Sequence, residues 1–75
     1  MMHRPKKRSI TLDGHRTSVS IEEEFWHQFV LIARNQGKSI NVLATEIDHI
    51  RGLDVGLASA IRLFVLSHAL GRTFP

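Results

Sequence analysis

The sequence predicts a small, mainly α-helical domain that opens with a short β-ribbon. Two observations lead to this fold class. Polar and apolar residues alternate over residues 9–21, with a break at Asp13 and Gly14, and a period of two residues is typical of strands. Beyond this ribbon, apolar residues recur at three- and four-residue spacing in three separate segments, which is typical of helices. A chain of 75 residues has room for one domain.

The first predicted element is the ribbon itself. Asp13 and Gly14 are a signal for a two-residue type I′ turn, and a hairpin about that turn pairs Leu12 with His15. Because cross-strand partners share a face, each face of such a hairpin collects residues of one character. The mainly apolar face holds Ile10, Leu12, Thr17, Val19 and Ile21, and the polar face holds Lys7, Ser9, Thr11, Arg16, Ser18 and Ser20. The pattern leaves open whether residues 7–12 pair with residues 15–21 or lie apart as a free arm.

The first helix is predicted at about residues 22–36. Three consecutive glutamates open it, and acidic residues stabilise the positive end of a helix dipole. Ser20 and Glu23 also have the spacing of a capping box. The apolar stripe consists of Phe25, Phe29, Ile32 and Ala33. Gly37 is the expected residue after the helix end, where a left-handed conformation favours glycine.

Two more helices are predicted, at about residues 40–51 and 57–70. Ser39 precedes the first of these and is a favourable N-cap residue. Apolar residues cover more than half the circumference of the last helix. Such wide coverage indicates burial in a core or at a subunit interface, and much apolar side chain on so short a chain suggests a second copy.

Positive charge is concentrated at the N-terminus. Residues 1–8 contain Arg4, Lys6, Lys7 and Arg8, whereas the other six basic residues are offset by seven acidic residues. We therefore divide the chain into a basic N-terminal arm at residues 1–8 and a nearly neutral domain at residues 9–75. Basic arms of this kind bind phosphate backbones.

Several classes of function are disfavoured by the composition. The chain has no cysteine, so neither a disulfide nor a thiolate metal site is expected. No two of its five histidines have the helical spacing of metal ligands, and no nucleophile, phosphate-binding loop or paired carboxylate stands out. We expect no enzyme activity, cofactor, metal or small-molecule ligand. The longest apolar run is too short to span a bilayer, which predicts a cytoplasmic protein.

The order of these segments resembles a known family. The strand "RTSVSI" runs directly into the helix "EEEFWHQFVLIARNQ", and the turn "GKS" leads into "INVLATEI". Over residues 15–51 this resembles the ribbon-helix-helix family of bacterial repressors, the class of Arc and MetJ. The pair "FW" and the tail "LASAIRLFVL" are similar to a short bacterial subfamily with an added C-terminal helix.

The resemblance implies an intertwined homodimer that binds double-stranded DNA. In the family, two chains pair their strands into an antiparallel ribbon that enters the major groove. Carried onto this chain, the base-reading residues are Arg16, Ser18 and Ser20. The second helix would grip a phosphate through Lys38, Ser39, Ile40 and Asn41, with the basic arm on neighbouring phosphates. The expected dimer core is Val19, Ile21, Phe25, Phe29, Leu43, Ile47, Ile61 and Phe64.

The first half of the ribbon departs from the family pattern. If residues 7–12 were the family strand, Lys7, Ser9 and Thr11 would face the groove, but about nine residues would then separate strand and helix. If a full hairpin forms, a dimer has up to four strands, a width of about 19 Å against a groove of about 12 Å. We predict a dimeric, sequence-specific transcriptional regulator. The alternative is a homodimeric protein-interaction module that has this fold but does not read DNA.

Overall fold

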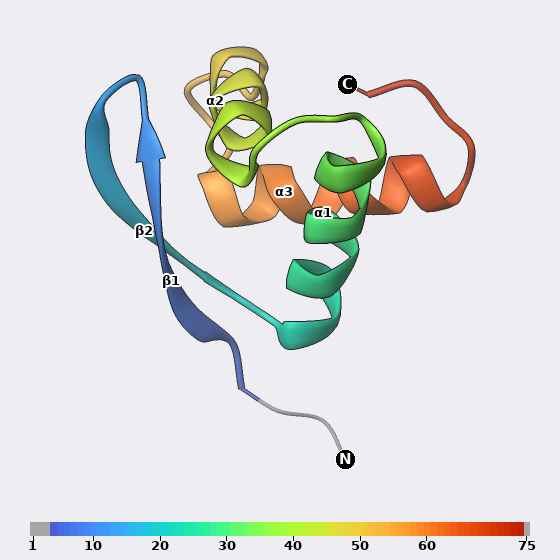
Figure 1. Cartoon of the computed structure of the whole chain (residues 1–75), viewed down its shortest axis with the longest axis horizontal. Coiled ribbons are helices and arrows are strands. Elements are labelled where there is room, and N and C mark those ends of the chain that lie inside the picture. Colours follow the sequence, from blue (N-terminus) through green and yellow to red (C-terminus); the bar gives the residue numbers. More distant parts are fainter. Residues whose placement is uncertain (1–3, 75) are drawn as a thin grey trace.

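The computed structural model describes residues 4–74, in which a two-stranded hairpin precedes three helices (Figure 1). The strands are β1 (Lys6–Leu12) and β2 (His15–Ile21). The helices are α1 (Glu23–Asn35), α2 (Ile40–Ile50) and α3 (Leu57–Ala69). The predicted fold class is confirmed, and each predicted helix boundary lies within one residue of the observed one.

The hairpin has the register that the sequence predicted. Leu12 pairs with His15 across the turn, and the antiparallel pairing continues to Lys6 opposite Ile21. Asp13 and Gly14 have φ angles of 50° and 82°, and positive φ at both central residues defines a type I′ turn. The question left open by the sequence is settled, because residues 7–12 are paired over their whole length. Three of the four cations assigned to the arm therefore lie in β1.

One face of the hairpin packs on the helices. Ile10, Val19 and Ile21 are buried on this face, as the alternation predicted. Thr17 belongs to the same face by register but is exposed. Its partner across the ladder is the buried Ile10, and α2 packs on β1. At this level of the hairpin, the helical layer thus covers the β1 side and leaves the β2 side open.

The helix ends follow local rules with one exception. The Ser39 hydroxyl accepts a hydrogen bond from the backbone N–H of Val42 at 3.1 Å, so the predicted N-cap of α2 is confirmed. Gly37 (φ 68°) ends α1 in the left-handed conformation. The predicted capping box is wrong, because Ser20 remains in β2 opposite Lys7, and the N-cap is Glu22, whose side chain makes no capping hydrogen bond.

The core joins β2 to all three helices. Its largest fully buried side chains are Ile21, Phe29, Ile47 and Ile61, one from each of these elements. α3 runs across α1 and α2 (Figure 1). Of the residues expected in a dimer core, Val19, Ile21, Phe29, Leu43, Ile47 and Ile61 are buried within the single chain, and Phe25 and Phe64 pack against them. Across residues 4–74, no helix has the length and apolar character needed to cross a membrane.

Candidate nucleic-acid interface

The outward face of the hairpin is entirely polar. The pairs on this face are Lys7 with Ser20, Ser9 with Ser18, and Thr11 with Arg16. All six side chains are exposed except that of Thr11, which is half-buried. The face has two cations, four hydroxyl groups and no acid. The three residues predicted to read bases therefore share one exposed surface with three residues of β1.

The backbone edges of the hairpin differ from each other. In a two-residue hairpin the pair next to the loop exchanges hydrogen bonds, and such pairs alternate along the ladder. The N–H and C=O groups of Arg16, Ser18 and Ser20 consequently point away from β1. Arg62 of α3 donates to the Ser20 carbonyl at 3.4 Å. On the other edge, the N–H of Thr11 donates to Asn41 Oδ1 at 2.9 Å, so each edge is partly covered by a helix.

The inward face carries a cation that the sequence assigned to phosphate binding. Arg8 Nη2 donates to both carboxylate oxygens of Glu23, at 2.5 and 3.1 Å. Its guanidinium carbon lies 5.3 Å from the centroid of the Trp26 ring, within the range of a cation–π contact. Arg8 thus fixes β1 to the start of α1, and its charge is balanced inside the fold.

Glu23 receives further positive charge from its surroundings. Lys6 Nζ lies 3.8 Å from Oε1 and His27 Nε2 lies 3.9 Å from Oε2. Desolvation raises the pKa of the Glu23 carboxyl, but the hydrogen bond from Arg8 and the charges of Lys6, Arg8 and His27 outweigh it. The pKa is therefore lowered overall, and Glu23 stays ionised at neutral pH.

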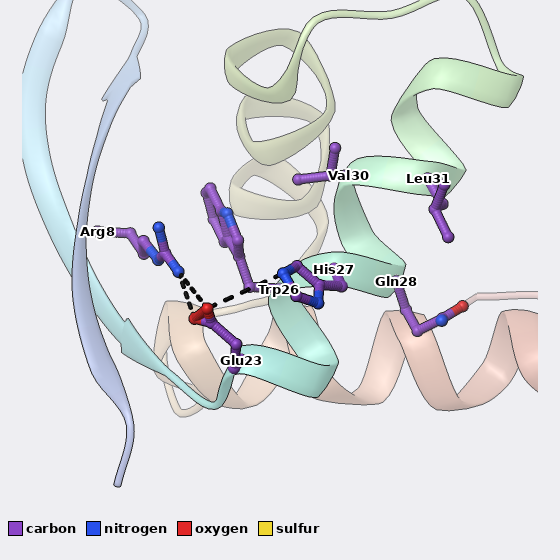
Figure 2. Close-up of a pocket in the computed structure, with 7 residues that line it drawn as sticks. All are labelled: Arg8, Glu23, Trp26, His27, Gln28, Val30 and Leu31. Atoms are coloured by element: carbon purple, nitrogen blue, oxygen red, sulfur yellow. Dashed lines mark hydrogen bonds and ion pairs between the residues drawn. The ribbon is translucent and has the colours of Figure 1, made fainter. Parts of the chain in front are cut away.

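Beside this cluster, α1 and β1 border an open hollow of about 580 Å³ (Figure 2). Its lining consists of Arg8, Glu23, Trp26, His27, Gln28, Val30 and Leu31. In Figure 2, Arg8 and Glu23 point toward each other across the space, whereas Leu31 points away from them. The two opposite charges of the hollow are thus paired with each other.

Four of the eight predicted phosphate-binding residues, at positions 38–41, lie together at the start of α2. Lys38 Nζ is 2.7 Å from Glu46 Oε1, and the side-chain oxygen of Asn41 accepts the bond from Thr11. The first backbone N–H groups of a helix have no partner within it. Among residues 4–74, those of Ile40 and Asn41 have no other backbone or side-chain acceptor, so they point toward an anion-binding position beside β1.

Arg62 is a positioning residue that the sequence did not reveal. Its Nε and Nη2 atoms donate to the two carboxylate oxygens of Glu22 at 2.7 and 3.1 Å. The hydrogen bond from Arg62 is the largest cause of a lowered pKa at Glu22. Arg62 therefore ties α3 to the junction between β2 and α1. The signal in the sequence was a single cation inside an apolar helix, which identifies no partner by itself.

The hairpin tip is attached to α2 by a second polar contact. His49 Nε2 lies 2.7 Å from Asp13 Oδ2. The hydrogen bond with Asp13 is the main cause of a raised pKa at His49. The hairpin tip is therefore held at Asp13 by His49 and, two residues earlier in β1, at Thr11 by Asn41. This places the outward face of the hairpin in a defined orientation relative to the start of α2.

A comparison with protein families identifies this arrangement. The family model described as a ribbon-helix-helix domain matches residues 5–69. The chain belongs to the ribbon-helix-helix family. The match begins before β1 and ends with the last residue of α3, so the first strand and the third helix lie inside the matched domain. No curated protein and no solved structure gives a significant match.

Ribbon-helix-helix domains are a class of DNA-binding regulatory modules, and membership suggests that class for this protein. The strand–helix–turn–helix resemblance covered residues 15–51, and the matched domain also includes β1 and the C-terminal helix that the tail "LASAIRLFVL" resembled. Within the part of the chain that the structure describes, no three histidine, aspartate or glutamate side chains gather in a metal-binding arrangement.

Proposed function

We propose that this ribbon-helix-helix protein binds double-stranded DNA sequence-specifically and regulates transcription. The observation that carries the proposal is the fixed outward projection of Arg16, Ser18 and Ser20 along β2. The residues between the serines and at the strand end, Val19 and Ile21, are buried in the core. Because the inward face of the hairpin is packed on the helices, the ribbon is already ordered before its polar side chains meet base edges.

The chemistry of the three side chains suits the major groove. An arginine can donate two parallel hydrogen bonds to O6 and N7 of guanine, and serine hydroxyls donate or accept. No ion pair of residues 4–74 involves Arg16, so its guanidinium does not have to leave a carboxylate to reach a base. Arg16 is therefore assigned the strongest specific contact.

Affinity would come mainly from phosphate contacts. Arg4, Lys6 and Lys7 are exposed at the start of β1 or just before it, and the free N–H groups of Ile40 and Asn41 support an anion at α2. Lys38 joins them at little cost, because its pair with Glu46 is exposed and exposed ion pairs are weak. Arg8 is not part of this set in the structure, because Glu23 holds it.

The family resemblance implies that two copies act together, and we assign that contact to α3. Leu63, Leu66 and Leu70 form a stripe on this helix, and each is about half exposed. They lie on the side opposite the buried Ala60, Ile61 and Val65. A second copy packed on this stripe gives a two-fold dimer, and the DNA site of such a dimer is roughly palindromic. We expect the protein to bind DNA in the cytoplasm of a bacterium.

Selection of bound sequences from a random duplex pool tests the proposal directly. We expect an enriched, roughly palindromic site, whose affinity falls steeply as salt is raised. A Leu66→Glu variant should sediment as a monomer if α3 forms the dimer contact. If no sequence is enriched and the amount of duplex bound does not depend on salt, sequence-specific DNA binding is contradicted. The protein would then be better interpreted as an interaction module, with the leucine stripe of α3 as its contact surface.

A further inference from the structure

We propose that the hairpin of a single chain is the complete two-stranded ribbon that enters the groove. In this arrangement β1 supplies Lys7, Ser9 and Thr11 to the same reading face as the three residues of β2. The inference rests on the proposed DNA binding and changes how it is built. The resemblance implied a ribbon shared between two chains, whereas here each chain would read its own segment of groove.

The pairing of the strands is the first support. Every cross-strand pair on the outward face joins one residue of β1 to one residue of β2, so neither strand presents its polar side chains alone. The face as a whole is a continuous antiparallel ribbon of seven residues per strand. A two-stranded ribbon of this kind is one of the elements that the major groove can admit. The sequence offered either residues 7–12 or residues 15–21 as the strand that faces the groove. In this arrangement both strands face it together.

The width of the sheet is the second support. Strands lie about 4.8 Å apart, so a two-stranded ribbon is about 10 Å wide, and the major groove is about 12 Å wide. Pairing the β2 strands of two chains would give the order β1-β2-β2-β1. That sheet is about 19 Å wide and does not fit. Because β1 and β2 are already paired in one chain, only the single-chain ribbon has the width of the groove.

The state of the β2 edge is the third support. A partner strand would have to bond to the outward N–H and C=O groups of Arg16, Ser18 and Ser20. Arg62 already contacts the Ser20 carbonyl while it holds Glu22 through two further bonds. The unobstructed part of this edge is limited to the segment near Arg16 and Ser18. That is a short template for an intermolecular ribbon, since strands of about five or six residues are usual.

The positions of the two cations suggest the form of the half-site. Lys7 stands opposite Ser20 near one end of the face, and Arg16 stands opposite Thr11 near the other. The two pairs are four residue steps apart along each strand, which is about 13 Å, or about four base steps at about 3.4 Å each. Lysine and arginine both favour guanine O6 and N7. We expect guanines about four base pairs apart, with hydroxyl contacts from Ser9 and Ser18 between them.

Backbone N-methylation at Ser18 separates the two ribbon arrangements. The Ser18 N–H points away from β1, so a methyl group there blocks pairing with a partner strand and leaves the hairpin intact. We expect the synthetic full-length chain with this change to bind the selected duplex within about threefold of the unmodified chain. The matched control is N-methylation at Thr17, whose N–H bonds to β1, and this change should abolish both the hairpin signal in circular dichroism and DNA binding.

A matched pair of lysine substitutions tests the part assigned to β1. Lys6 and Lys7 are neighbours on opposite faces of the strand, so Lys6→Ala and Lys7→Ala remove the same charge from nearly the same place. We expect Lys7→Ala to weaken binding to the selected site by about tenfold more than Lys6→Ala. We also expect Lys7→Ala to relax the preference at one of the two guanine positions, as measured by repeating the selection.

The possible failures of this inference are distinct from failure of the function. If the unmodified chain binds no duplex at all, both the proposed function and the inference fall. If the unmodified chain binds but the folded N-methyl-Ser18 chain does not, DNA binding stands and the ribbon is shared between chains. Equal effects of Lys6→Ala and Lys7→Ala, without a change of preference, would also remove β1 from the reading face.

Discussion

The two faces of the hairpin each carry an arginine, and the two arginines have opposite environments. Arg8 on the inward face is bonded to Glu23 and lies over Trp26. Arg16 on the outward face is exposed and has no carboxylate partner among residues 4–74. The pleat of the strand causes the difference, because successive side chains point to opposite sides. Position within the alternation therefore decides whether a cation stabilises the fold or is available to a ligand.

The largest expected effect is a loss of stability when a buried residue on the inward face of the hairpin is truncated. Ile21→Ala should lower the free energy of unfolding by about 2–5 kcal/mol, because it removes a fully buried side chain and leaves a cavity. Its neighbour Ser20 points outward, and Ser20→Ala should change stability by less than about 0.5 kcal/mol. Urea unfolding followed by circular dichroism measures both. Similar losses at the two positions would contradict the division into a structural and a polar face.

The next effect concerns the outward face. Arg16→Ala should weaken binding to the selected DNA site by about 1–3 kcal/mol, the usual scale of one bidentate base contact. Its unfolding free energy should be unchanged, because Arg16 is exposed and outside every ion pair of the described residues. A gel-shift titration with specific and random duplexes measures this. Unchanged binding would exclude Arg16 from the base-reading set.

Arg8→Ala should have the complementary profile. It should lower the free energy of unfolding by about 1 kcal/mol, because the contact with Trp26 is lost, and the Glu23 carboxylate loses its closest partner. DNA binding of the folded fraction should change less than it does for Arg16→Ala. Thermal unfolding and the same gel-shift titration report the two quantities. A larger effect on DNA binding than on stability would show that Arg8 leaves Glu23 to contact a phosphate.

Much of the fold could be predicted because local signals agreed with one another. Asp13 and Gly14 fixed the turn, and the turn fixed the register of every pair in the hairpin. Ser39 and Gly37 marked helix ends through rules that involve only neighbouring residues. Ser20 shows where this reasoning fails. Its spacing to Glu23 fits a capping box, but the ladder with Lys7 competes for the same backbone and keeps Ser20 in the strand.

The partners of the charged residues could not be predicted from the sequence. Arg62 and Glu22 are 40 positions apart and Asp13 and His49 are 36 apart, so no local periodicity relates them. The role of Arg8 was missed for the same reason, since its place among the basic residues suggested an arm and only the packed fold shows Glu23 and Trp26 beside it. The outward position of Arg16, Ser18 and Ser20 was predictable, because it follows from the alternation alone.

Arg4 allows a weaker test of how far positive charge alone contributes. It precedes β1 and is exposed. If it contacts one phosphate, Arg4→Ala should reduce the slope of log K against log salt by about 1 and affect specific and random duplexes alike. Binding measured at several salt concentrations gives the slope. The same slope in both proteins would mean that Arg4 does not reach the DNA backbone, and the phosphate contacts would then come from Lys6 and the start of α2.

The smallest expected effect is a pH dependence at the hairpin tip. Asp13 raises the pKa of His49 above its ordinary value of 6.5. A group whose pKa is raised on folding contributes stability below its ordinary pKa, and this contribution is lost as pH rises through the folded value. The contact between tip and α2 should therefore weaken from mildly acidic to mildly basic pH.

Asp13→Asn preserves the turn, because asparagine tolerates positive φ, and it removes the charge. Nuclear magnetic resonance titration should show the pKa of His49 falling toward 6.5 in this variant, with a flatter dependence of thermal stability on pH. An unchanged titration of His49 would mean that the tip is not held by Asp13, and the outward face would then depend on Asn41 and Arg62 for its orientation.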